Sequence, residues 1–261
     1  MKSVFGIQFS VFGIILLYKT ICYNGFIIHN LKSKNRKPSL SNMPDSFNRC
    51  NEALSSYPVA IPGPAGVLEG KVDCAVGGAA LGIAVICHPH PLYGGSMHNK
   101  VVHTLAKLLA VCSYTAVRFN FRGVGDSAGS YDEGIGEADD AMAVADWALK
   151  QQAGMPVILA GFSFGSFVAL QAASKIQTRA LITVAPPVRM FDFENLHGID
   201  CPWLLIQGDQ DEVVEVNSVI NWVRTLKHPP QLEIVNDSSH FFHGKLIELR
   251  SICEDFVQKL G

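Results

Sequence analysis

The sequence lacks the features that mark nucleic-acid-binding and metal-stabilised proteins. Charged residues make up 17% of the 261 residues and the net charge is -2, so no basic surface for nucleic acid is indicated. The seven cysteines are odd in number and none is spaced as C-x-x-C, which argues against a disulfide framework and a structural zinc site. We therefore expect free thiols, a reducing compartment and a cytoplasmic protein that needs no metal.

Long apolar runs are also absent, with one partial exception at the N-terminus. Val4 to Leu17 is almost continuously apolar, but Lys19 interrupts the roughly 20 residues that a membrane helix needs. Three interpretations stay open. The segment is a signal peptide, although no small-x-small cleavage site follows it. It is a membrane anchor over residues 4–28, with the rest of the chain on the cytoplasmic side, and this would be the protein's membrane contact. Or it is a disordered leader upstream of a true start at Met43.

The chain after this leader is long enough for one sizeable core, and we divide it into a leader, 1–57, and a compact domain, 58–261. Two strand-forming runs around residues 62–66 predict a β-hairpin. Buried strand patterns then alternate with amphipathic helical patterns, as in a mostly parallel sheet with helices on both faces. We expect the acids of one helix, over residues 137–150, to form its solvated face: Glu137, Asp139, Asp140 and Asp146.

One stretch organises the rest of the chain. An apolar strand pattern leads into Gly161-Phe162-Ser163-Phe164-Gly165, and a run of small and apolar residues suited to a helix follows. A G-x-S-x-G pattern between a strand and a helix is typical of a nucleophile elbow, a tight turn that lifts a serine out of a sheet. Because a serine hydroxyl is a weak nucleophile, it must meet a base there. We predict that Ser163 is the nucleophile.

Further reactive side chains follow later strands of the expected sheet. Asp209 and Asp211 come directly after the strand that ends near residue 207, and His240 follows the last strand. Because the functional loops of a parallel sheet gather at the carboxyl ends of its strands, these side chains should lie near Ser163. Serine, aspartate and histidine in this order are expected of a hydrolase triad, in which the histidine is the base and the aspartate orients it.

The sequence resembles the α/β-hydrolase superfamily, and within it the small lid-less bacterial serine hydrolases with a His-Pro-His-Pro-x-Tyr-Gly-Gly loop. The matching segments are residues 88–95, 118–125, 161–165, 208–214 and 240–242. The resemblance implies an α/β-hydrolase fold with a mostly parallel sheet of about eight strands, and it favours Asp211 over Asp209 as the triad acid. The connection between the strands near residues 185 and 201 is too short for a helical lid, so we expect no cap domain.

The oxyanion hole of such an enzyme needs two backbone N–H groups about 3 Å from the developing negative charge. The residue after the nucleophile, Phe164, should supply one of them. The resemblance places the other in the loop at 88–95, where the prolines have no N–H to donate. His90, Leu92 and Tyr93 remain, and we select His90 and Leu92.

We expect a hydrolase that cleaves a carboxylic ester, or else a thioester or an amide, through an acyl-enzyme on Ser163. The substrate would be a small acyl compound, and no cofactor is implied. An open site rich in apolar side chains would suit short to medium acyl chains; the candidates are Tyr93, Phe162, Phe164, Met190, Phe191 and Phe241. Two alternatives stay open: an acyltransferase with the same triad, and a non-catalytic binding module of the same fold.

Two other kinds of site are disfavoured. His88 and His90 have no third metal-ligating residue nearby in the sequence, so we interpret them as parts of a structural loop. Gly123-Val124-Gly125 does not complete the G-x-G-x-x-G pattern of a dinucleotide site, and we expect a tight turn there. The sequence does not indicate an oligomeric state.

Overall fold

The computed structural model describes residues 55–193, 196 and 198–261, together with two short strands near the N-terminus. The chain divides into two compact units, residues 1–42 and 43–261. In the first unit, β1 (Cys22–Tyr23) pairs antiparallel with β2 (Phe26–Ile27). The rest of the apolar segment at 4–28 lies outside the described residues. Within the part of the chain that is described, no helix combines the length and apolar character needed to cross a membrane.

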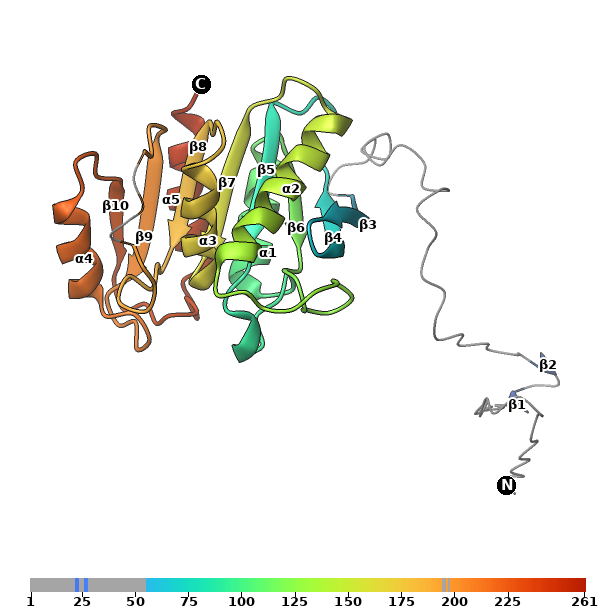
Figure 1. The fold of residues 1–261 in the computed structure, drawn as a ribbon, viewed down its shortest axis with the longest axis horizontal. Helices are drawn as coiled ribbons and strands as arrows, with labels where there is room; N and C mark the ends of the chain where they lie inside the picture. The colour runs from blue at the N-terminus through green and yellow to red at the C-terminus, as the bar shows by residue number, and fades with distance from the viewer. Residues whose placement is uncertain (1–21, 24–25, 28–54, 194–195, 197) are drawn as a thin grey trace. The chain divides into compact units, whose positions relative to one another are not determined.

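The second unit is built on one eight-stranded sheet with the order β10-β9-β8-β7-β5-β6-β4-β3 (Figure 1). Its strands are β3 (Ser56–Gly63), β4 (Gly66–Asp73), β5 (Gly82–Cys87), β6 (Tyr114–Phe119), β7 (Val157–Phe162), β8 (Ala180–Val184), β9 (Trp203–Gly208) and β10 (Gln231–Val235). The six strands from β5 to β10 run parallel, and the hairpin β3–β4 joins antiparallel to β6. The predicted hairpin and the mostly parallel sheet are confirmed.

Helices cover both faces of this sheet. They are α1 (Lys100–Val111), α2 (Ile135–Gln151), α3 (Phe164–Ala173), α4 (Val216–Thr225) and α5 (Leu246–Gln258), with a short 3-10 helix η2 (Pro91–Tyr93). Figure 1 shows α2, α3 and α4 in front of the sheet and α1 and α5 behind it. In the described residues no helix interrupts the connection from β8 to β9, as expected for a fold without a cap.

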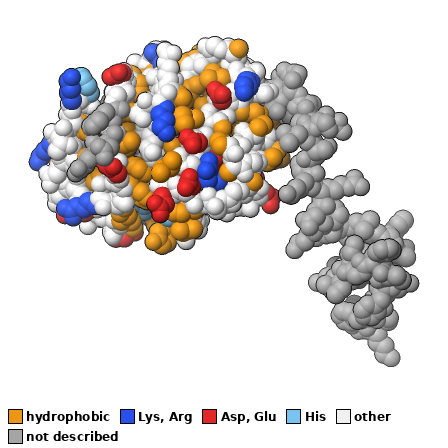
Figure 2. Space-filling view, viewed as in Figure 1, with side chains coloured by type: hydrophobic (Ala, Val, Ile, Leu, Met, Phe, Trp, Pro, Cys, Tyr) orange, Lys and Arg blue, Asp and Glu red, His pale blue; other side chains and the backbone are white. Residues whose placement is uncertain are grey.

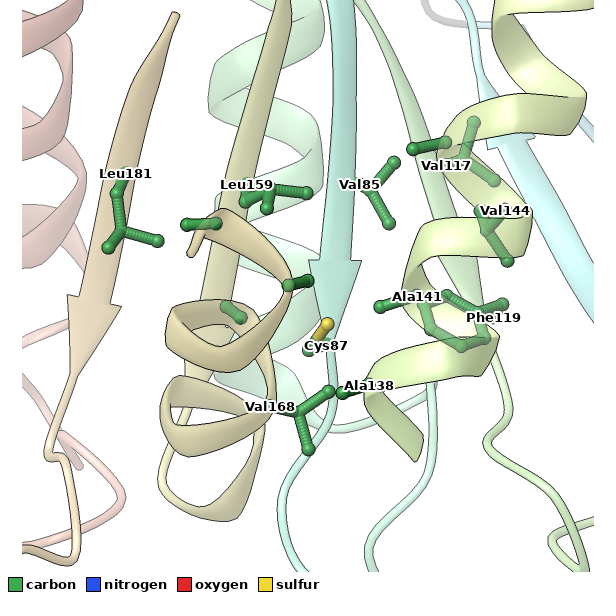
Figure 3. Packing of buried hydrophobic residues seen from close by; sticks show 14 of the residues in the cluster. Val85, Cys87, Val117, Phe119, Ala138, Ala141, Val144, Leu159, Val168 and Leu181 are labelled. Carbon is green, nitrogen blue, oxygen red and sulfur yellow. The ribbon is translucent and has the colours of Figure 1, made fainter. Parts of the chain in front are cut away.

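The strands β5 to β9 are buried on both faces because each face carries its own apolar layer. Alternating side chains of β5 point into opposite layers: Val85 and Cys87 pack with α2 and α3, whereas Ala84 and Ile86 pack with α1 and α5. Figure 3 shows part of the first layer, where Ala138 and Ala141 of α2 bring that helix close to the strands. Small residues at the contact permit this close packing. Because both faces of the sheet are packed in this way, the ends of its strands hold the loops that follow them in fixed positions.

The prediction of a solvated acidic face on α2 is wrong for two of its four acids. Glu137 and Asp140 are fully buried. Glu137 accepts the backbone N–H groups of Asp132 and Gly134, each at 2.8 Å, and so caps the start of the helix. Asp140 accepts three hydrogen bonds from Arg122, one from its backbone N–H and two from its guanidinium group. A buried carboxylate needs such partners, and the helical periodicity alone does not reveal them.

The cysteines also depart from the expectation in one position. Cys74 is disulfide-bonded, so the expectation of free thiols throughout is wrong there. The other cysteines whose side chains are described are free: Cys87, Cys112, Cys201 and Cys253. Burial raises the pKa of the Cys87 thiol far above its usual range, so this residue behaves as an inert part of the core.

Candidate active site

Ser163 occupies the turn between β7 and α3, near the middle of the sheet. Its backbone has φ 54° and ψ -122°, a conformation that L-residues rarely adopt. Two glycines permit this turn. A Cβ on Gly161 would lie 2.0 Å from the carbonyl oxygen of Gly165, and a Cβ on Gly165 would lie 2.3 Å from that of Cys87. Backbone atoms cannot give way as side chains do, so the sequence needs glycine at both places.

His240 lies in the loop after β10, and its ring joins the serine to an aspartate. The Ser163 hydroxyl lies 3.1 Å from His240 Nε2, and His240 Nδ1 lies 2.8 Å from Asp211 Oδ2. Both contacts exist together in the neutral ring if Nδ1 carries the proton and Nε2 accepts from the hydroxyl. The structure thus brings together three of the predicted residues, which are far apart in the sequence, in the order serine, histidine, aspartate. Asp209 does not contact the histidine ring.

The Asp211 side chain is fully buried and accepts four hydrogen bonds. Its Oδ1 accepts the backbone N–H groups of Val213 and Val214 at 2.8 and 2.7 Å, and its Oδ2 accepts from His240 Nδ1 and from the Gln207 amide. Burial acts to raise the pKa of Asp211, but the histidine and the two backbone donors outweigh it and hold the pKa below its usual value of 3.8. The resulting stabilisation is present above the unfolded-state pKa of about 4 and is lost as the pH falls through the folded-state pKa.

The aspartate loop and the histidine loop are held together by further contacts that the sequence analysis missed. Glu212 Oε2 accepts the backbone N–H of His240 at 3.1 Å. Asp209 Oδ1 accepts the backbone N–H of Ser238, in the loop that carries His240, at 3.3 Å. A Cβ on Gly208 would lie 2.3 Å from the Ser238 carbonyl oxygen, so a glycine is needed where the loops meet. An acidic cluster after a strand was the available signal, but the sequence does not show which acid binds which loop.

The loop after β5 lies against the turn that carries Ser163. The ring centroids of His90 and Phe164 are 4.9 Å apart. Within the described residues, the backbone N–H groups of His90 and Phe164 donate to no protein acceptor, whereas that of Leu92 donates to His90 Nδ1 at 3.2 Å. His90 Nε2 lies 3.2 Å from the Tyr131 hydroxyl, so both nitrogens of this ring have partners. Of the two N–H groups selected in this loop, the one on His90 is the group left free for a substrate.

Buried polar side chains anchor both ends of the same loop. At its start, His88 is fully buried; its Nδ1 lies 2.6 Å from the Pro89 carbonyl oxygen, and its Nε2 accepts the N–H of Phe121. Burial lowers the pKa of His88 to about 4, so the ring stays neutral at pH 7. At the other end, the backbone N–H of Met97 donates to the side-chain oxygen of Asn120, and the backbone carbonyl oxygen of Met97 accepts from the Arg118 guanidinium. The loop is therefore fixed before any substrate arrives.

These contacts also bear on metal and cofactor sites. Both ring nitrogens of His88 and of His90 already have partners in the protein. Among the described residues, no group of three histidine, cysteine or acidic side chains is placed to hold a metal ion.

A cavity of about 600 Å³ lies at the amino ends of the strands, away from Ser163, where Val157 begins β7 and Pro202 precedes β9. Its lining does not include Ser163, Asp211 or His240.

Apolar side chains are exposed in the loops that follow the parallel strands. Figure 2 shows hydrophobic side chains at the lower end of the domain, to which the parallel strands point in Figure 1. The exposed residues in the loops at this end of the sheet include Tyr93, 87% exposed, and Leu92, Met190, Val213 and Phe241. Two residues expected to line the site do not reach this surface: Phe162 and Phe164 are buried in the two core layers. We call the five exposed side chains the apolar rim.

Comparison with known proteins finds a matching family model and a similar sequence. A family model described as serine aminopeptidase, S33, matches residues 79–194. The chain is 36% identical to an uncharacterised protein of Rickettsia prowazekii over 205 residues, which are 75% of this chain and 86% of that protein.

Two solved structures share both sequence and fold with the chain. A Xanthomonas campestris protein described as an α/β serine hydrolase without a lid is 44% identical, with a TM-score of 0.75, and the match covers 80% of this chain and 97% of that one. An α/β serine hydrolase homologue from Coxiella burnetii is also 44% identical, with a TM-score of 0.74 and coverage of 78% and 97%.

Proposed function

The chain belongs to the α/β-hydrolase superfamily and is a hydrolase, and we propose that it cleaves carboxylic esters through an acyl-enzyme on Ser163. The observation that carries this proposal is the chain of hydrogen-bond contacts from Ser163 through His240 to Asp211, at 3.1 and 2.8 Å. A serine hydroxyl that faces a neutral imidazole, itself held by a buried carboxylate, is arranged to attack an acyl carbon.

In the proposed mechanism, His240 Nε2 takes the proton of the Ser163 hydroxyl as its oxygen attacks the carbonyl carbon. The imidazolium that forms is stabilised by Asp211, which stays ionised. The backbone N–H groups of Phe164 and His90 stabilise the negative charge on the substrate oxygen. The proton then passes from His240 to the leaving alcohol. Water attacks the acyl-enzyme in the same way, and the free acid leaves.

The proposed substrate is a small ester with a short to medium acyl chain. The apolar rim offers contact to an acyl group from several sides, and the described residues place no helix over it. Such an open site binds fewer methylene groups than a deep tunnel would, and each methylene buried contributes about 0.8 kcal/mol. Thioesters and amides pass through the same tetrahedral intermediate and are tested beside the esters.

An acyltransferase or a binding module of the same fold would share much of this geometry. A transferase must keep water from the acyl-enzyme, and the exposed rim does not favour this. A binding module has no need for a serine in a strained turn that faces a base. Both alternatives are outcomes of the experiment below.

The experiment is covalent labelling joined to a substrate panel. A fluorophosphonate probe should add once, at Ser163, and Ser163→Ala should abolish both labelling and turnover of p-nitrophenyl esters of graded chain length. Ser174→Ala, which alters an exposed serine at the other end of α3, is the matched control and should change neither. Labelling that persists in Ser163→Ala would refute the assignment. Ester products with an added alcohol would indicate a transferase, and an unlabelled wild type would indicate a binding module.

We also propose a cytoplasmic location, based on the free thiols at Cys87, Cys112, Cys201 and Cys253. The disulfide of Cys74 weighs against it. Alkylation after acid quenching and denaturation of whole cells, followed by mass spectrometry, tests this: because Cys74 is fully buried, only the unfolded chain exposes it. A reducing compartment would leave Cys74 alkylated, whereas an oxidising one would leave it protected.

A further inference from the structure

Gln207 has no role in the mechanism above, yet it contacts the group that the mechanism depends on. It lies near the end of β9, and its side chain is fully buried. Its Nε2 lies 3.0 Å from Asp211 Oδ2, 3.0 Å from the carbonyl oxygen of Val214 and 3.3 Å from that of Gly208. The same Asp211 oxygen accepts from His240 Nδ1. Gln207 and His240 therefore hold one carboxylate oxygen between them.

The neighbours of the amide fix its orientation. All three groups around Nε2 are acceptors, two carbonyl oxygens and a carboxylate oxygen, so only the NH2 end of the amide can face them. The other end, Oε1, is buried and accepts no hydrogen bond from the described residues. A buried amide oxygen without a partner destabilises the folded state. An apolar residue of similar size would avoid this cost, so the amide has to be explained by what its NH2 group does.

We propose that Gln207 is a positioning residue for the reaction: it holds the Asp211 carboxylate so that Oδ2 stays aimed at His240 Nδ1. The inference rests on the proposed function. With Oδ1 bound by two backbone N–H groups and Oδ2 by Gln207, the carboxylate has no freedom to rotate when the imidazole becomes charged. The donor is neutral, so it orients the carboxylate and leaves its full negative charge to stabilise the imidazolium. A lysine or arginine in its place would offset that charge.

The first test replaces the amide with an apolar side chain of similar length, in Gln207→Met. We expect kcat to fall about 10- to 100-fold, since a hydrogen bond to a charged group is lost where the transition state needs it. KM should stay within about twofold, because Gln207 does not touch the substrate. Thr183→Val is the matched control: it removes a buried polar group from the neighbouring strand, one that bonds Trp203, and should lower stability without lowering kcat. A kcat for Gln207→Met within twofold of wild type would overturn the proposal.

The second test uses pH. In Gln207→Glu, the protonated acid can still donate to Asp211, whereas the ionised acid repels it. The ratio of mutant to wild-type kcat should therefore be highest at the acid end and fall as the pH rises. The same ratio for Gln207→Met should be flat. A flat ratio for both variants would show that the side chain acts only through packing.

A double-mutant cycle separates positioning from a structural role. If Gln207 acts through Asp211, then Gln207→Met should lower kcat by less than about twofold once Asp211 has been changed to Asn. An equal fall in both backgrounds would refute the inference. These outcomes can be told apart from failure of the proposed function. A wild type that neither reacts with the fluorophosphonate nor turns over esters would overturn both the proposed function and the inference about Gln207. An active wild type in which the effects of Gln207→Met and Asp211→Asn on kcat are additive would overturn the inference about Gln207 alone.

Discussion

The roles of the two aspartates after β9 can be separated by removing one charge at a time. In Asp211→Asn, one oxygen becomes an NH2 group. The two backbone N–H groups of Val213 and Val214 bind Oδ1 and require an oxygen there, so the new NH2 takes the place of Oδ2 and the hydrogen bond from Gln207 is lost. It then faces His240 Nδ1, which must accept instead of donate. The ring proton moves to Nε2 and points at Ser163, and the base is lost.

This change of tautomer sets the expected magnitude. We expect kcat to fall by about 10⁴, the size of effect found when a triad aspartate becomes an amide in a serine protease. Asp209→Asn removes the same charge, but its amide oxygen can keep the 3.3 Å bond from the Ser238 N–H. We expect kcat within a fewfold of wild type and a loss of less than about 1 kcal/mol in the free energy of unfolding.

The assay measures kcat with one p-nitrophenyl ester and the melting temperature by circular dichroism, for both variants and the wild type. The melting curves show whether each variant is folded, so that a loss of rate is not mistaken for a loss of protein. If Asp209→Asn is inactive and folded while Asp211→Asn keeps its activity, the reasoning from the hydrogen bonds is refuted and the two roles are exchanged.

Three further predictions follow from packing and charge. Gly165→Ala should abolish turnover and lower the free energy of unfolding by about 3 kcal/mol or more, because its Cβ would lie 2.3 Å from the Cys87 carbonyl oxygen; urea denaturation measures this. Asp140→Asn should cost about 3 kcal/mol by the same measurement, because it removes the buried anion of the Arg122 guanidinium and leaves only the exposed Asp132, at 3.7 Å; an unchanged midpoint would contradict this. Deletion of residues 1–42 should leave folded, active protein, and a marked fall in melting temperature would show that the leader packs on the domain.

How much of this site was predictable depended on whether the signal was local. The turn that carries Ser163 could be predicted because the strand, the glycines and the helix are adjacent in sequence, and each glycine has a steric reason to be there. The fold followed from alternating buried strands and amphipathic helices, a pattern that is also local. The choice of Asp211 over Asp209 came from family resemblance, and the contact with His240 Nδ1 supplies a geometric reason for it.

The features that escaped prediction depend on which partner each polar side chain binds. Glu137 and Asp140 look like surface acids on a helical wheel, and only the positions of Gly134 and Arg122 show why they are buried. Gln207 follows four apolar residues and is the next-to-last residue of β9, and the sequence around it does not indicate that it binds Asp211, four residues later. Such long or side-chain-specific contacts carry no periodic signal, so a single sequence does not reveal them.

The apolar rim has a consequence for how this protein can change. Its side chains come from loops that follow different strands, and they are exposed, so replacing one of them removes little packing from either core layer. Substitutions of this kind usually alter stability by less than about 0.5 kcal/mol. The residues that would discriminate between acyl groups are therefore largely independent of those that hold the fold. Leu92, Tyr93, Met190 and Phe241 are the positions at which a randomised library should shift substrate preference while most of its members still fold.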